Sequence, residues 1–155
     1  MLIVNPNHKN PSPSSAIEAP IWCAYLARKY HGTILDAEAE GLTVDETLER
    51  IGREPSILVA MGANPSASST PKMGVINKLT KNLHFYHIAG LHPTVGRRRR
   101  RLPGAEQLCG LTPKWDSIDF SKYKAHNWQC LDGSDRWNYG VMYTSFGCPF
   151  NCSYC

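Results

Sequence analysis

Ile57-Leu58-Val59-Ala60-Met61 is an uninterrupted apolar run, and it decides the fold class of this chain. A strand with one face in water alternates apolar and polar residues, whereas a strand covered on both faces shows no alternation. The run stops at Gly62-Ala63-Asn64, where small and polar residues take over. We therefore predict a strand in the interior of a parallel sheet, with helices on both faces of that sheet.

Shorter strand patterns lie on either side of this run. We predict strands at residues 2–4, 33–35 and 83–89, each followed by a polar residue or a glycine. Their spacing leaves room for a helix between each pair of consecutive strands. In a parallel sheet such a crossover helix is the usual connection.

Three helices are predicted between the strands. The first opens at Pro20, because the first turn of a helix does not use the N–H that proline lacks, and it is broken at Gly32. The second begins with Thr43 and Glu46, a capping box in which each side chain satisfies the backbone N–H of the other residue. The third starts at Thr70-Pro71. This alternation predicts an α/β fold: a Rossmann-like (flavodoxin-like) parallel sheet with flanking helices, followed by an irregular linker and a cysteine loop.

The carboxyl ends of the predicted strands carry small and polar residues. Ligands of open parallel sheets bind beyond these ends, near the point at which the strand order reverses. Such an edge suits a large polar cofactor that backbone groups approach, although α/β proteins in general place turn residues there. The residues at these ends that we take as candidate cofactor contacts are Asn7, Asn64, Ser69, Gly90 and His92.

Three of the six cysteines form the motif C-x-x-x-C-x-x-C at residues 148–155. Cys148, Cys152 and Cys155 are candidate ligands of an iron–sulfur cluster. Four protein ligands close a [4Fe–4S] cluster, whereas three leave one iron open for another ligand. The spacing therefore favours a cluster that does chemistry over one that only carries electrons.

Zinc and disulfides are the alternatives for the cysteines. Cys130 or His126 would be the fourth ligand of a zinc site, although zinc sites usually combine two closely spaced pairs. Disulfides are disfavoured, because we see no secretory signal and expect a reducing, cytoplasmic compartment. Cys23 falls in the first predicted helix, where we expect a small buried apolar residue and not a ligand.

The cysteine motif resembles that of the radical S-adenosylmethionine (SAM) superfamily, including the aromatic residue before the third cysteine, here Tyr154. The resemblance implies that the three cysteines hold a [4Fe–4S] cluster whose open iron chelates the amino and carboxylate groups of SAM. An electron from the cluster would cleave the sulfonium and give a 5′-deoxyadenosyl radical. Tyr154 would pack near the adenine, and residues 139–146 would form the strand that leads into the cysteine loop.

The region before the motif is similar to the cobalamin-binding domain of cobalamin-dependent radical SAM proteins. The similarity implies a cobalamin-binding-like domain at 1–94, a linker at 95–138 and the start of the radical SAM domain at 139–155. Residues 115–123 resemble the linker that leads into the catalytic barrel. The sequence lacks the string D-x-H-x-x-G, so we expect no protein histidine below the corrin. The strand-end phrases that carry the similarity are Val4-Asn5-Pro6-Asn7, Ile34-Leu35-Asp36-Ala37, Gly62-Ala63-Asn64-Pro65-Ser66 and Ala89-Gly90-Leu91-His92-Pro93-Thr94.

The reaction that this resemblance implies is methyl transfer or a radical rearrangement at an unactivated carbon. Such an enzyme encloses SAM in a βα barrel, whose eight-unit form takes about 250 residues. No barrel sequence follows Cys155, so we expect no catalysis by this chain alone. It would be a fragment, a shortened relative, or one chain of an enzyme whose partner chain supplies the barrel. The alternatives are a non-catalytic α/β binding or structural protein, and a zinc-binding protein, that has lost the barrel.

Charge and hydropathy limit the partners of the chain. The formal net charge is +4, and much of it lies in the five arginines at 97–101. Adjacent like charges favour a solvated loop, which we prefer over a site for nucleic-acid phosphates. No apolar stretch approaches the length of about 20 residues that crosses a bilayer, so no membrane partner is expected. The aromatic residues between Trp115 and Tyr143 are expected to pack the linker against the sheet.

Overall fold

The centre of the molecule is a four-stranded sheet in which all strand pairs are parallel. It is seen in a computed structural model, in which residues 69–73 are described by their backbone alone. The residues that the structure describes are 1–7, 16–59, 69–89, 108, 110–125, 132, 134–140 and 142.

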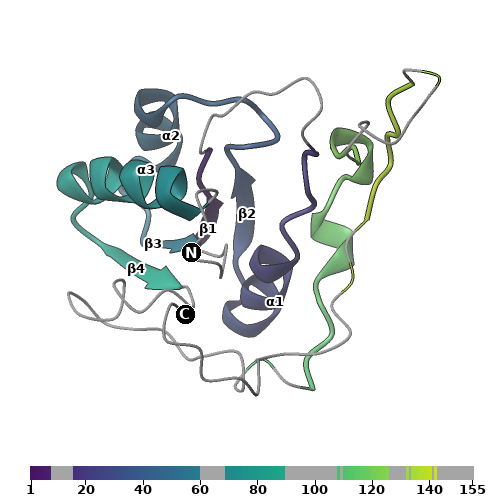
Figure 1. Ribbon diagram of the computed structural model, residues 1–155. Coiled ribbons are helices and arrows are strands. Elements are labelled where there is room, and N and C mark those ends of the chain that lie inside the picture. Colours follow the sequence, from purple (N-terminus) through teal and green to yellow (C-terminus); the bar gives the residue numbers. More distant parts are fainter. Residues whose placement is uncertain are drawn as a thin grey trace, which may run out of the picture.

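The strands follow the order β2-β1-β3-β4 across the sheet (Figure 1). They are β1 (Leu2–Asn5), β2 (Thr33–Asp36), β3 (Ser56–Val59) and β4 (Tyr86–Ala89). The chain runs from β1 to β2 at one edge, and then returns past β1 to form β3 and β4. The strand order therefore reverses between β1 and β3. This arrangement confirms the predicted Rossmann-like α/β fold.

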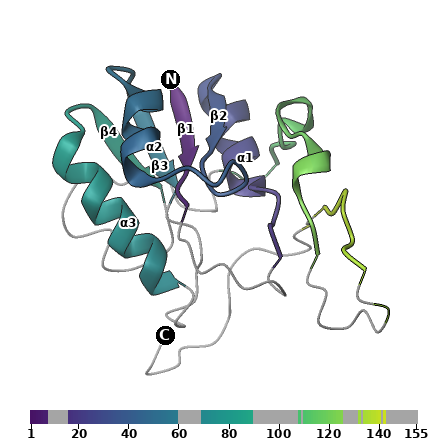
Figure 2. The same ribbon diagram turned by 90° about the horizontal axis from the view of Figure 1, so that it is seen from above.

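Helices cover both faces of the sheet. One face carries α1 (Ile21–Tyr30), and the other carries α2 (Val44–Ile51) and α3 (Ser69–Asn82) (Figure 2). Successive side chains of a strand point to opposite faces. Ile3 accordingly packs on the α1 side and Val4 on the side of α2 and α3. Because both faces are covered, the central strands β1 and β3 carry buried apolar residues at consecutive positions.

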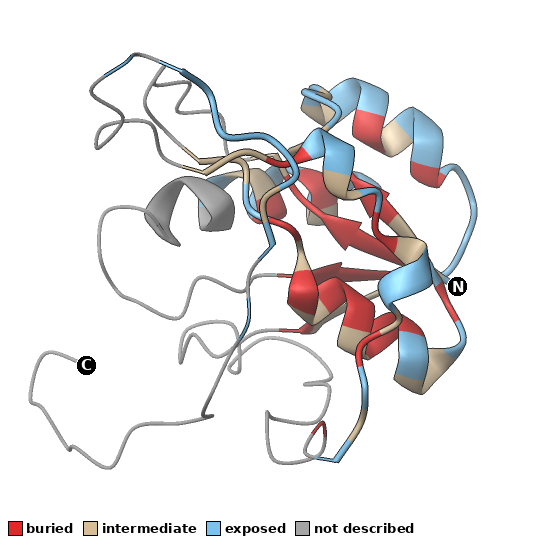
Figure 3. Ribbon diagram, turned by 90° about the vertical axis from the view of Figure 1, so that its right-hand side faces the viewer, coloured by how far each residue is buried: buried red, intermediate tan, exposed pale blue. Residues whose placement is uncertain are grey.

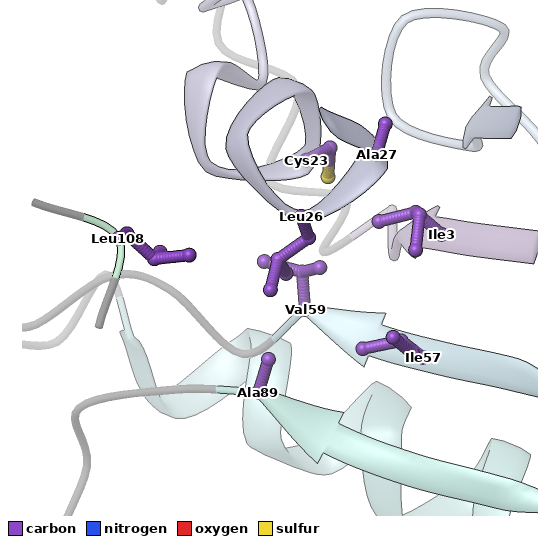
Figure 4. Close-up of a cluster of buried hydrophobic side chains, with 8 residues drawn as sticks. All are labelled: Ile3, Cys23, Leu26, Ala27, Ile57, Val59, Ala89 and Leu108. Atoms are coloured by element: carbon purple, nitrogen blue, oxygen red, sulfur yellow. The ribbon is translucent and has the colours of Figure 1, made fainter. Parts of the chain in front are cut away.

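The core on the α1 side joins the helix to the middle of the sheet. Cys23 and Leu26 of α1 pack with Ile57 and Val59 of β3. Leu108 also belongs to this core, and its side chain points toward Leu26 and Val59 (Figure 4). Buried residues concentrate on the strands and on the helix faces that meet them (Figure 3). The burial of Cys23 confirms that it is a small apolar residue of the core.

The first turn of α2 confirms the predicted capping box. The backbone N–H of Thr43 donates to Glu46 Oε2 at 2.7 Å, and the backbone N–H of Glu46 donates to Thr43 Oγ1 at 3.2 Å. Two N–H groups that have no partner within the helix are satisfied in this way.

Helix α1 ends at Tyr30, just before the glycine that was predicted to break it. His31, and not Gly32, adopts the left-handed conformation, with a φ of 51°. Gly32 is required for space: a Cβ there would lie 2.9 Å from Met1 O and 3.0 Å from Ile3 Cγ1. The glycine lets the chain pass close to β1 as it enters β2.

The last strand starts at Tyr86 and not at Leu83 as predicted. Its partner strand β3 begins at Ser56, which lies opposite Tyr86 and donates its N–H to Phe85 O at 3.1 Å. Leu83 has no residue of β3 to pair with. Phe85 is 73% exposed, which reflects its position before the paired part of the strand.

Residues 111–125, which we call the strap, run beside α1 on the β2 side of the molecule (Figures 1 and 2). The strap is irregular, with 3₁₀ turns at Trp115–Ser117 and Phe120–Lys122. Tyr123 is buried, as predicted, and it packs with Ala24 of α1.

Two other aromatic residues of this region contradict the packing prediction. Trp115 is exposed and packs on Phe120 of the strap itself, with ring centroids 6.0 Å apart. Trp137 is exposed too, and Lys124 Nζ lies 5.7 Å from its ring centroid. The contacts with Ala19 and Ala24 are made by Ile118 and Tyr123, and not by these two indole rings.

The strand predicted at residues 139–146 does not begin where expected. Tyr139, Gly140 and Met142 are not in a strand, and the rest of this segment lies outside the described residues. Tyr139 instead donates its N–H to Tyr123 O at 3.2 Å, which ties it to the strap. Of the helices within the described ranges, none has the length and apolar character needed to cross a membrane.

Candidate functional site

The carboxyl ends of β1 and β3 lie next to each other where the strand order reverses, the edge at which such folds bind ligands. β1 ends at Asn5, and the chain continues through Pro6 and Asn7. β3 ends at Val59, and residues 60–68 that follow it lie outside the described part of the chain. Of the segments that follow the strands at this edge, the structure describes those after β1 and β2.

A buried polar cluster occupies the ends of β1 and β2. Asn5 and Asp36 are opposite each other in the sheet, and each is 6% exposed. Asn5 Nδ2 donates to Asp36 Oδ1 at 2.8 Å. The Tyr123 hydroxyl donates to Asp36 Oδ2 at 2.8 Å, and the Ala39 N–H donates to Oδ1 at 3.1 Å. Both oxygens of the carboxylate are thus hydrogen-bonded, and we call these four residues the Asp36 cluster.

The turn after β2 holds the cluster in place. The Asp36 carbonyl accepts the N–H of Glu40 at 3.1 Å, and the Ala37 carbonyl accepts the N–H of Leu42 at 2.9 Å. Asn7 Nδ2 donates to Leu42 O at 2.9 Å, so the chain that leaves β1 is bound to the same turn. Asp and Asn suit this position because their short side chains hydrogen-bond nearby backbone groups.

Burial governs the ionisation of the cluster. It raises the pKa of Asp36 above the usual 3.8, and the hydrogen bonds from Ala39, Asn5 and Tyr123 oppose this rise. Burial and the adjacent Asp36 charge raise the pKa of Tyr123, so its hydroxyl stays protonated and remains a donor. A permanent donor and a fully hydrogen-bonded carboxylate are suited to positioning the chain, and not to moving a proton.

The structure places two of the nine residues predicted as site residues. Asn7 is half-buried and bound to the turn after β2, and Ser69 is the first residue of α3. Because the Ser69 side chain is not described, the structure does not bring these two residues into one contact. The others lie outside the described residues: Asn64, Gly90, His92, Cys148, Cys152, Tyr154 and Cys155.

No metal centre is formed by the part of the chain that the structure describes. Within it, no three His, Cys, Asp or Glu residues come together as ligands. Cys23, the cysteine that lies in this part, is buried in the α1 core. The predicted cluster cysteines and the alternative zinc ligands His126 and Cys130 lie outside it.

Asn5, Asp36 and Tyr123 were not among the predicted site residues. The polar residues that end two neighbouring apolar strands were a usable signal, because parallel neighbours with matched ends bring such residues together. Tyr123 carried no comparable signal, since it lies 87 positions from Asp36 in the sequence. It was expected only as a packing aromatic.

Comparisons of this chain with family models, with curated proteins and with solved structures give no significant match. The cysteine motif and the chain's own fold are therefore the features that bear on its function.

Proposed function

We propose that this chain is the amino-terminal part of a cobalamin-dependent radical SAM enzyme that carries out methyl transfer or a radical rearrangement. In this proposal Cys148, Cys152 and Cys155 hold a [4Fe–4S] cluster that binds SAM, and the carboxyl edge of the sheet holds cobalamin. The observation that carries the proposal is the spacing C-x-x-x-C-x-x-C with an aromatic residue, Tyr154, before the last cysteine.

The donor set of the motif supports a cluster with one open iron. Thiolates are the ligands that iron–sulfur clusters prefer, and the segment supplies three of them in close succession. When bound, such a cluster supplies the electron that cleaves SAM. The part of this chain would be to hold the cluster through its cysteines and to pack Tyr154 against the adenine.

In this proposal a large ligand lies at the β1–β3 end of the sheet. The Asp36 cluster limits which residues are left to contact it. Asn5 and Asp36 bind each other, and Asp36 also binds the strap, so the end of β2 is engaged within the protein. Contacts to a cofactor would then come from Asn7 and from the segments that follow β3 and β4. The candidates in those segments are Asn64, Ser69, Gly90 and His92.

Anaerobic reconstitution with iron and sulfide tests the cluster. We expect iron and acid-labile sulfide in equal amounts, broad visible absorption, and an EPR signal of the reduced protein that changes when SAM is added. The change is informative because SAM coordinates a cluster only through an open iron. The Cys152→Ala variant should lose all of these signals, whereas Cys109→Ala, outside the motif, should keep them.

The same preparation separates the alternatives. A colourless protein that contains zinc, and loses it in Cys152→Ala, would favour the zinc-binding alternative. A protein that takes up neither metal would favour a non-catalytic α/β binding or structural protein. Cobalamin is tested separately by dialysis against hydroxocobalamin. We expect binding that weakens in Asn64→Leu and is unchanged in Asn77→Leu, a matched substitution on the exposed side of α3.

A further inference from the structure

The strap is fastened to α1 by two hydrogen bonds and an ion pair. The Lys114 N–H donates to Ala24 O at 3.2 Å, and Arg28 Nε donates to Thr112 O at 3.4 Å. Arg28 also lies 4.0 Å from Asp116, and both side chains are largely exposed. Exposed pairs of this kind contribute little, because water and salt screen them.

The other end of the strap is held by similar contacts. Lys122 Nζ lies 3.7 Å from Glu40 Oε1. Lys124 and Ile17 exchange backbone hydrogen bonds of 2.9 and 3.2 Å in an isolated bridge. These bonds join the strap to the chain before α1, and not to the sheet itself.

Few side chains of the strap are buried. The buried ones are Pro113, Ile118 and Tyr123. Ile118 and Tyr123 pack with Ala19 and Ala24 in a small cluster that meets the sheet at Ile34, and Leu111 packs on the edge of the α1 core. The bond from Tyr123 to Asp36 is the buried side-chain hydrogen bond that joins the described strap to the sheet. A segment with few buried side chains opens at a lower free energy than the core does.

We propose that the strap is a gate over the carboxyl end of β2, latched by the hydrogen bond from the Tyr123 hydroxyl to Asp36. The gate opens as a unit while the sheet stays folded, and opening exposes Asp36 and Asn5 at the edge where folds of this class bind ligands. The inference is independent of the proposed function, since it uses only contacts within the described domain.

Hydrogen exchange tests the gate with the whole chain. The reporters are the amides of Ile17, Lys124 and Tyr139, whose hydrogen bonds close the strap. In Tyr123→Phe we expect these amides to exchange about tenfold to a hundredfold faster, because a bond to a buried carboxylate is lost. Amides of β1 and β3 should keep their rates. Tyr30→Phe, the same substitution on α1, should leave the strap amides unchanged.

The wild-type protein gives a second, independent readout. At low urea the strap amides should exchange with a smaller urea dependence than the amides of β1 and β3, because a local opening exposes less surface than global unfolding. Equal rates and equal urea dependence in strap and sheet would overturn the proposal. So would Tyr123→Phe variants that leave strap exchange unchanged, or that accelerate the sheet as much as the strap.

Discussion

Gly32 is needed for close packing against β1, whereas its place after a helix suggests that it is needed for a left-handed turn. A glycine after a helix predicts a left-handed helix end. Here His31 takes that conformation, and Gly32 makes room for the backbone of β1. The sequence marks the correct boundary, but only the fold shows which atoms approach the glycine.

Replacing Gly32 should destabilise the fold. A Cβ at Gly32 would meet Met1 O at 2.9 Å, and the backbone at the start of β1 would have to shift. We expect Gly32→Ala to lower the free energy of unfolding by about 1 to 3 kcal/mol. Gly74→Ala is the matched control: nothing lies within 4 Å of its added Cβ, and alanine should stabilise α3 by up to about 1 kcal/mol. Urea denaturation of both variants measures the difference, and equal stabilities would show that β1 yields without cost.

The raised pKa of Asp36 should make the stability of the fold depend on pH. Its folded pKa lies above 3.8, so above that pH the folded state holds this proton more tightly than the unfolded chain does. The stabilising contribution is therefore complete below 3.8 and declines as the pH rises through the folded pKa.

The comparison with Asp36→Asn isolates this effect. Asparagine does not ionise in this pH range. Its side-chain oxygen can still accept the hydrogen bond from Asn5, and its side-chain NH₂ can donate one to the Tyr123 hydroxyl. The free energy of unfolding of the wild type, relative to that of the variant, should fall as the pH rises above 3.8. Urea denaturation across this range measures it. A difference that stays constant or grows with pH would mean that burial does not dominate the ionisation of Asp36.

At the scale of single elements, local chemistry explains most of what forms. The capping box of α2, the apolar run of β3 and the start of α3 are all set by residues close in sequence. The predicted bounds of an element were wrong where a partner distant in the sequence determines them. β4 starts where β3 provides a partner, and the apolar character of residues 139–146 does not place Tyr139 in a strand.

The capping box gives a direct test of one element. Thr43→Ala removes the acceptor for the Glu46 N–H and should lower the free energy of unfolding by about 1 kcal/mol. Thr80→Ala is the control, because its hydroxyl bonds to Asn77 O within α3 and alanine compensates through its higher helix propensity. If both variants lose the same stability in urea, the effect belongs to the loss of any helix hydroxyl and not to the cap.

At the scale of the whole molecule, the sequence predicted the layers but not how the later residues complete them. The alternation of strands and helices was sufficient to predict a parallel sheet covered on both faces. The strand ends were predicted to form a ligand edge, and the bond from Tyr123 that covers the β2 end could not be found from local patterns. Long-range contacts of this kind depend on the final path of the chain.

Leu108 and the strap should therefore contribute to the stability of the first ninety residues. Leu108 packs into the α1 core, Ile118 packs with Ala24, and Tyr123 covers Asp36. Burying a side chain such as Leu or Ile stabilises by about 1.5 to 3 kcal/mol. A chain that ends after residue 94 loses all three contacts, whereas one that ends after residue 140 keeps them, together with the bond from Tyr139 to the strap.

We expect the chain of residues 1–94 to be several kcal/mol less stable than that of residues 1–140. This loss is a large share of the free energy of unfolding of a typical domain, roughly 5 to 15 kcal/mol. Thermal and urea unfolding of the two chains measure this difference. The shorter chain should also expose Cys23, so its thiol should react faster with a maleimide than in the longer chain carrying alanine at its other cysteines. Equal stability and equal thiol reactivity would mean that the sheet and its three helices form a complete domain, to which the strap adds nothing but a cover.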